Sequence, residues 1–134
     1  MKKGILWAGV VLLVIGVTTA FWLYNMPHRK ANAEPFVTLK ATELYKSFEA
    51  NEAEANENYL DKVIEVHGIV SSVSINQQGD QVILMQSNDP MFGVSCTMDK
   101  SMQDVKPGQS LYLKGICKGY LSDVVLTDCI YIKH

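Results

Sequence analysis

An unbroken apolar run of 20 residues, Ile5 to Tyr24, is the feature that most constrains how this chain can fold. A helix of that length reaches about 30 Å, the thickness of the hydrocarbon core of a bilayer. Aromatic residues near both ends of the run suit the interfacial layers of a membrane. Basic residues flank the run on both sides: Lys2, Lys3, His28, Arg29 and Lys30. We therefore predict that residues 1–30 form a single-pass transmembrane anchor with its basic flank.

The alternative reading of this run is a secretory signal peptide that is cleaved. A signal peptide has an apolar core of about 7–15 residues, followed by a small-residue cleavage motif. Here the core is longer, and the motif Ala31-Asn32-Ala33 lies beyond basic residues that disfavour processing. The length therefore favours a retained anchor. Because a very short amino-terminal tail usually stays inside, we expect the carboxy-terminal domain to be extracytoplasmic, and periplasmic if the cell has two membranes.

The rest of the chain is acidic. Residues 31–134 contain 8 lysines, no arginine and 14 acidic residues, which gives a net charge of −6. Proteins that bind nucleic-acid phosphates carry clustered lysine and arginine. The composition therefore disfavours nucleic acid as a partner. It leaves the membrane, another envelope protein or a small ligand.

Residues 31–61 are expected to form a tether and a short helical hairpin. Leu44 and Phe48 lie four residues apart, so they share one face of a helix for which Thr42 is a candidate cap. Asn51 interrupts the pattern before a second helical stretch over residues 52–60. The acidic residues of the hairpin are expected to form a solvated face, because no His or Cys accompanies them in a metal-binding pattern.

From Val63 onward the apolar period changes to two, which is typical of strands. Strands are expected over residues 63–75, 81–86 and 92–98, from residue 110 onward, and over residues 123–133. The first strand is unusually long and changes phase at Gly68, as a strand does where a barrel bends. A short helical link is expected over residues 99–105. A mostly β chain with this pattern predicts a five-stranded OB-fold barrel over residues 62–134.

Three segments also resemble the tRNA_anti-like family. They are residues 58–70 (NYLDKVIEVHGIV), 107–119 (PGQSLYLKGICKG) and 123–129 (DVVLTDC). The family consists of small bacterial OB-fold domains, many with an amino-terminal membrane or lipid anchor. The resemblance covers about residues 40–134, and it implies a fold, an anchor and an unassigned role. The missing arginines leave the likeness to anticodon-binding domains without phosphate contacts.

The chain has three cysteines, Cys96, Cys117 and Cys129, so at least one is unpaired in a monomer. Cys117 and Cys129 flank an expected hairpin, and an oxidising compartment would favour a disulfide between them. Strand alternation places these two on opposite faces unless a bulge shifts the register. The alternative is three buried free thiols. No metal site is expected, because no C-x-x-C occurs and His67 is the one histidine within the expected strands.

Two functions fit this organisation, and a third is weakly supported. The first is an extracytoplasmic OB-fold module that binds an unknown ligand across its second and third strands. The candidate residues of that face are Ile83, Met85, Ser95, Thr97 and Tyr120, with barrel core as the alternative for Ile83 and Met85. The second is a structural or assembly partner of another envelope protein. The third is a haem chaperone-like protein, although the terminal Tyr131-Ile-Lys-His134 does not match the His- and Tyr-containing tail of such proteins.

Catalysis is not expected. The sequence shows no nucleophile motif, phosphate-binding loop or paired-carboxylate pattern. The sequence displays no pairing of a cysteine with a histidine or cation of the kind that a catalytic thiolate needs. We therefore predict no catalytic residues and no cofactor.

Overall fold

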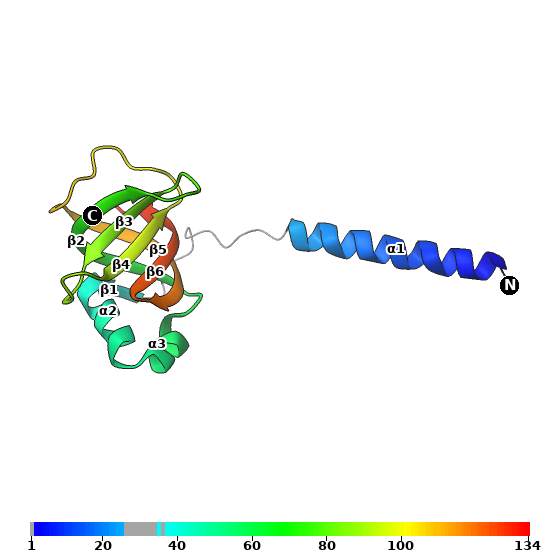
Figure 1. Cartoon of the computed structure of the whole chain (residues 1–134), viewed down its shortest axis with the longest axis horizontal. Coiled ribbons are helices and arrows are strands. Elements are labelled where there is room, and N and C mark those ends of the chain that lie inside the picture. Colours follow the sequence, from blue (N-terminus) through cyan, green and yellow to red (C-terminus); the bar gives the residue numbers. More distant parts are fainter. Residues whose placement is uncertain (1, 26–34, 36) are drawn as a thin grey trace.

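The computed structural model describes residues 2–25, 35 and 37–134. The apolar run forms one helix, α1 (Lys2–Tyr24), none of whose residues is buried, and it stands apart from the rest of the chain (Figure 1). This helix is long and apolar enough to cross a membrane, a property that anchors and signal sequences share. The expected basic flank after it and the motif at residues 31–33 lie outside the described residues.

Five strands pair in a ring and close a barrel (Figure 1). They are β2 (Val63–Ile75), β3 (Gln81–Gln86), β4 (Gly93–Met98), β5 (Ser110–Leu121) and β6 (Asp123–Tyr131). The strand order is β2-β3-β4-β6-β5, and β5 returns to pair with β2. Only the β4–β6 pairing within this ring is parallel. This arrangement confirms the predicted OB-fold barrel.

A sixth strand precedes the barrel. β1 (Val37–Lys40) pairs in parallel with the first half of β2, in a segment that the sequence predicted to be tether or hairpin. Four residues are too few to show a strand period, so the strand could not be recognised from the sequence. Helix α2 (Ala41–Ala50) follows at once, and the backbone N–H of Lys40 donates to the Glu43 carboxylate at 3.2 Å. Thr42 therefore lies inside the helix, and its prediction as the cap was wrong.

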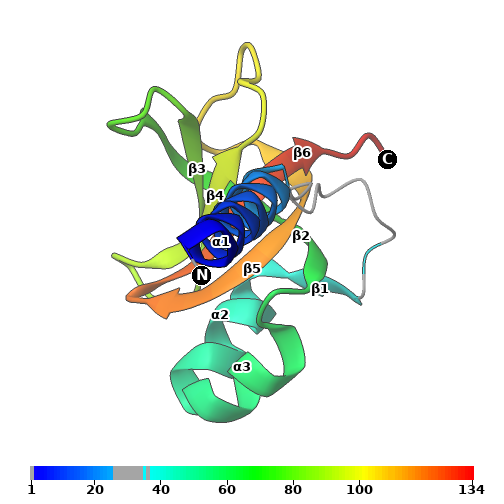
Figure 2. The same cartoon turned by 90° about the vertical axis from the view of Figure 1, so that its right-hand side faces the viewer.

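Helix α2 closes one end of the barrel. Its side chains Leu44, Tyr45 and Phe48 are buried in the same core as the inward residues of the strands. Asn51 separates α2 from α3 (Glu52–Tyr59), and its side-chain oxygen accepts the Glu54 N–H at 3.3 Å. Figure 2 shows both helices at the end of the barrel away from the long loop between β4 and β5.

That long loop contains no helix, so the expected helical link over residues 99–105 was wrong. The Gln81 side chain accepts the Met102 N–H at 2.8 Å and donates to the Met102 carbonyl at 3.0 Å. Asp104 has a left-handed backbone, with φ at 58°. These bonds and this dihedral hold the loop in a non-helical path, because the backbone groups of Met102 have side-chain partners instead of helical ones.

The phase of β2 changes at a bulge between Val70 and Ser72, later than the predicted switch at Gly68. Gly68 is needed for a different reason. A Cβ at that position would lie 2.9 Å from the Cβ of Ala41, where α2 begins. Glycine therefore lets α2 start directly against β2.

We expect Phe48→Ala to lower the free energy of unfolding by about 3–5 kcal/mol, because it empties a buried aromatic site. The Phe48 side chain is only 1% exposed. The measurement is the urea midpoint of the full chain in detergent micelles. Glu49→Ala, at an exposed position on the same helix, is the control and should change stability by less than about 0.5 kcal/mol. Equal midpoints for the two variants would contradict an integral role of α2 in the core.

Candidate functional site

The outer face of β3 is defined by residues that the sequence did not single out. Ile83 and Met85 are fully buried and point into the barrel, so their prediction for the binding face was wrong. Val82 and Leu84 point outward and are half-buried. Residues 82–85 are all apolar, so this run has no alternation from which its phase could be read. Only the pairing with β2 and β4 decides which side faces the core.

The outer face continues onto β4. Ser95 and Thr97 point outward, opposite Leu84 and Val82, which is the parity predicted for these two residues. On the next strand Val125 lies opposite Ser95. Seven outward residues of the three strands are uncharged: Val82, Leu84, Gln86, Ser95, Thr97, Val125 and Thr127. The result is an uncharged central surface, and β6 adds a carboxylate at each end of its part of it, Asp123 and Asp128.

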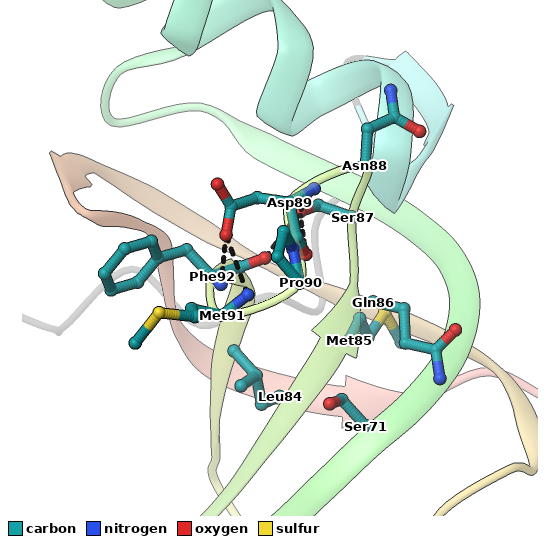
Figure 3. A pocket seen from close by; sticks show the side chains of 10 residues that line it. All are labelled: Ser71, Leu84, Met85, Gln86, Ser87, Asn88, Asp89, Pro90, Met91 and Phe92. Atoms are coloured by element: carbon teal, nitrogen blue, oxygen red, sulfur yellow. Dashed lines mark hydrogen bonds between the residues drawn. The ribbon is translucent and has the colours of Figure 1, made fainter.

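The loop that joins β3 to β4, residues 87–92, is held by its own side chains (Figure 3). The Asp89 carboxylate accepts the N–H of Met91 at 2.7 Å and the N–H of Phe92 at 3.0 Å. The Ser87 hydroxyl accepts the Asp89 N–H at 3.0 Å. Such side-chain-to-backbone bonds fix a turn in one conformation. They hold Met91 at 75% exposure and Phe92 at 37% exposure.

This loop is tied to the turn between β5 and β6. The Gly93 N–H donates to the Asp123 carboxylate at 2.8 Å. A side chain at Gly93 is excluded, because its Cβ would lie 2.0 Å from the Met85 carbonyl oxygen. Leu121, next to this turn, is 83% exposed. We call three large exposed apolar side chains the apolar rim: Met91 and Phe92 of the β3–β4 loop, and Leu121 at the end of β5.

A hollow of about 330 Å³ lies between the β3–β4 loop and the outer side of the sheet. Figure 3 shows Ser71 and Leu84 below the loop, with Met91 and Phe92 to one side. Small-molecule pockets have volumes of about 300–1,000 Å³, so this hollow is at the small end of that range. Asp89 is the one charged residue among those that line it. The hollow can therefore accept an apolar group, and its carboxylate can bind a donor or a cation.

Tyr120 belongs to the helical end of the barrel, so its predicted place on the binding face was wrong. Its ring stacks on Phe48 with centroids 6.0 Å apart and meets Tyr45 edge-on at 5.9 Å. A hydrogen bond with Tyr120, together with burial, raises the pKa of Tyr45 well above its ordinary value. The sequence could not show this, because α2 and β5 are far apart along the chain.

The three cysteines are free and fully buried. β5 and β6 pair so that Cys117 lies opposite Leu126. Gly115 is the β5 residue that faces Cys129, since a Cβ there would lie 2.4 Å from the Cys129 sulfur. The structure therefore does not bring Cys117 and Cys129 together as the predicted bridge requires. No group of three or more His, Cys, Asp or Glu residues suited to a metal occurs in the described part of the chain.

A cluster of polar and aromatic side chains lies on the outer side of β2 and β5. His134 Nε2 is 3.0 Å from Glu65 Oε1. Tyr112 lies between two imidazole rings, with its centroid 4.3 Å from that of His134 and 5.1 Å from that of His67. The buried Nδ1 of His67 has no hydrogen-bond partner among the described residues. These contacts hold the last residue against β2, and the sequence could not reveal them because they join distant segments.

Comparison with known proteins gives a family and a fold. The tRNA_anti-like family model matches residues 1–130. A crystal structure of a "putative nucleic acid-binding lipoprotein" from Klebsiella pneumoniae subsp. pneumoniae is similar, with a TM-score of 0.55 and 17% identity, over 81% of this chain and 100% of that one. A structure of yeast Stn1 and Ten1 gives a TM-score of 0.48 and 18% identity over 78% of this chain and 66% of that one. No curated protein matches the chain in sequence.

The raised pKa of Tyr45 predicts a stability loss at alkaline pH. Below about pH 10, the ordinary tyrosine pKa, this residue is neutral in both the folded and the unfolded chain. Above that pH the unfolded chain releases the proton first, so the stabilisation by neutral Tyr45 is lost as pH rises. We expect the urea midpoint of the wild type to fall more steeply above about pH 10 than that of Tyr45→Phe. Tyr131→Phe, at a partly exposed position, is the control and should keep the wild-type slope.

Proposed function

Because this chain belongs to the tRNA_anti-like family, we propose that it is a membrane-anchored, extracytoplasmic OB-fold module that binds a partner through the apolar rim and the outer face of β3 and β4. The observation that carries this proposal is the apolar rim. Two of its large side chains, Met91 and Phe92, are exposed on a loop that hydrogen bonds hold in place, and the third, Leu121, is exposed at the end of β5. Clustered exposed apolar side chains mark interaction sites, since exposure to water costs free energy that a partner removes.

The chemistry of the surface favours a protein segment with an apolar side chain as the ligand. The outward residues of β3 and β4 carry no charge, and the carboxylates of Asp89 and of Asp123, the first residue of β6, lie beside the rim. Carboxylates at the edge of a site repel phosphate groups and attract cations. The hollow next to Leu84 gives the surface a concave region for one side chain, which supports a binding module over a flat assembly contact.

The comparisons do not support the expectation that nucleic acid is disfavoured as a partner. That expectation came from composition, while the description of the similar Klebsiella lipoprotein names nucleic acid. At 17% identity the likeness supports the fold and not the ligand. The binding experiment below is therefore designed to separate a protein partner from a nucleic acid.

The proposed location rests on α1. This helix has no buried residue and is long enough to cross a bilayer. The similar protein is described as a lipoprotein, which supports a place in the cell envelope. The barrel would then be tethered close to the outer surface of the membrane, where it meets other envelope proteins.

A topology experiment tests the location. Gln77 lies exposed in the turn between β2 and β3. We expect a membrane-impermeant maleimide to label Gln77→Cys in intact cells, while the wild type stays unlabelled because its three thiols are fully buried. Labelling of Gln77→Cys only after lysis would contradict an extracytoplasmic barrel.

Site-specific photo-cross-linking in intact cells tests the binding surface. A photoreactive amino acid at Met91 or Leu121 should give the same discrete adduct, because both positions belong to the apolar rim. The matched control is Gln103, exposed in the loop at the other end of the barrel, and it should give no such adduct. An adduct that protease removes and nuclease leaves intact indicates a protein partner. The opposite sensitivity would indicate nucleic acid, and equal adducts at all three positions would contradict the proposed surface.

A further inference from the structure

Cys96 and Cys129 lie on neighbouring strands inside the barrel. In the parallel pairing of β4 with β6, Cys96 is opposite Leu126 and Met98 is opposite Cys129. Two steps along β4 therefore match three steps along β6, and the extra residue forms a bulge at which Asp128 has a φ of 52°. The bulge reverses the alternation of β6 and turns Cys129 inward. Both cysteines are 0% exposed.

The two thiols are therefore neighbours among the inward side chains of adjacent strands. The interaction of the Cys129 thiol with Cys96, together with burial, raises the pKa of Cys129. Gly115 leaves room for the pair, because a side chain there would collide with the Cys129 sulfur. The Cys117 thiol has different surroundings, where burial raises its pKa and the backbone of Gly119 lowers it.

We propose that Cys96 and Cys129 form a disulfide across β4 and β6 when the barrel is on the oxidising side of the membrane, a condition that rests on the location proposed above. The reaction is thiol–disulfide exchange with a disulfide-carrying oxidoreductase or a small-molecule disulfide. The Sγ–Sγ bond of the pair forms and the disulfide of the carrier breaks. The two thiols lose two electrons and two protons, and the carrier takes up both as two thiols.

The bond would join the central strand of the binding surface to its neighbour. β4 carries Ser95 and Thr97 on its outer side, and β6 carries Val125. Because the pair closes a loop that includes all of β5, the bond would restrict the unfolded chain and stabilise the folded barrel. Cys117 would remain a free buried thiol.

The number of free thiols in the purified full chain tests the inference. Cells are lysed with an alkylating reagent in denaturant, and labels per chain are counted by mass spectrometry before and after reduction. We expect one label before reduction, on Cys117, and three after it. Cys117→Ala should give none before reduction and two after, while Cys96→Ala and Cys129→Ala should each give two both before and after.

Two further measurements keep the outcome decisive. Three labels before reduction, in cells where Gln77→Cys is labelled from outside, would overturn the disulfide and leave the proposed location intact. Lack of outside labelling would instead count against the location. In that case, oxidation of the purified full chain by glutathione disulfide decides the pairing by itself. A disulfide-linked peptide pair that includes Cys117 would overturn the proposed pairing, and a pair that joins Cys96 to Cys129 would support it.

Discussion

The barrel depends on one strand that pairs with different partners along its length. The first half of β2 lies between β1 and β5, and its second half pairs with β3. The bulge between Val70 and Ser72 allows this change, because it bends the strand and reverses which side faces inward. Without that bend β2 could not meet both β3 and β5, and the ring of five strands would stay open. The inward and outward faces of every other strand follow from this closure.

The candidate binding surface follows from hydrogen bonds as much as from apolar character. Exposed apolar side chains on a mobile loop would collapse against the nearest apolar surface, because water disfavours them. Here Asp89 binds the backbone of its own loop, and Asp123 ties that loop to the next one. The rim therefore remains presented to solvent. A surface of this kind loses little conformational freedom on binding, which favours affinity.

The sequence predicted the parts of the site that depend on clear alternation and missed those that depend on packing. Ser95 and Thr97 alternate with buried residues, so their outward direction could be read. Ile83 and Met85 lie in an unbroken apolar run, and Tyr120 is covered by a helix about 75 residues earlier in the chain, so neither placement could be read from local pattern alone. The apolar rim was missed because its residues lie where regular alternation stops: Met91 and Phe92 precede β4, although the predicted strand began at residue 92, and Leu121 ends β5. At such positions an exposed and a buried apolar residue look alike in the sequence.

The amino-acid sequence by itself determined an apolar amino-terminal helix, a mostly β domain and the OB-fold strand pattern, because these depend on length, composition and short-range period. Tertiary structure alone decided the cysteine neighbours. A single bulge in β6 turns Cys129 inward, next to the strand that carries Cys96 and not opposite Cys117, and a one-residue change in register is invisible in a sequence with two competing phases. It also decided which apolar residues stay exposed, because burial depends on what packs over a side chain and not on the side chain itself.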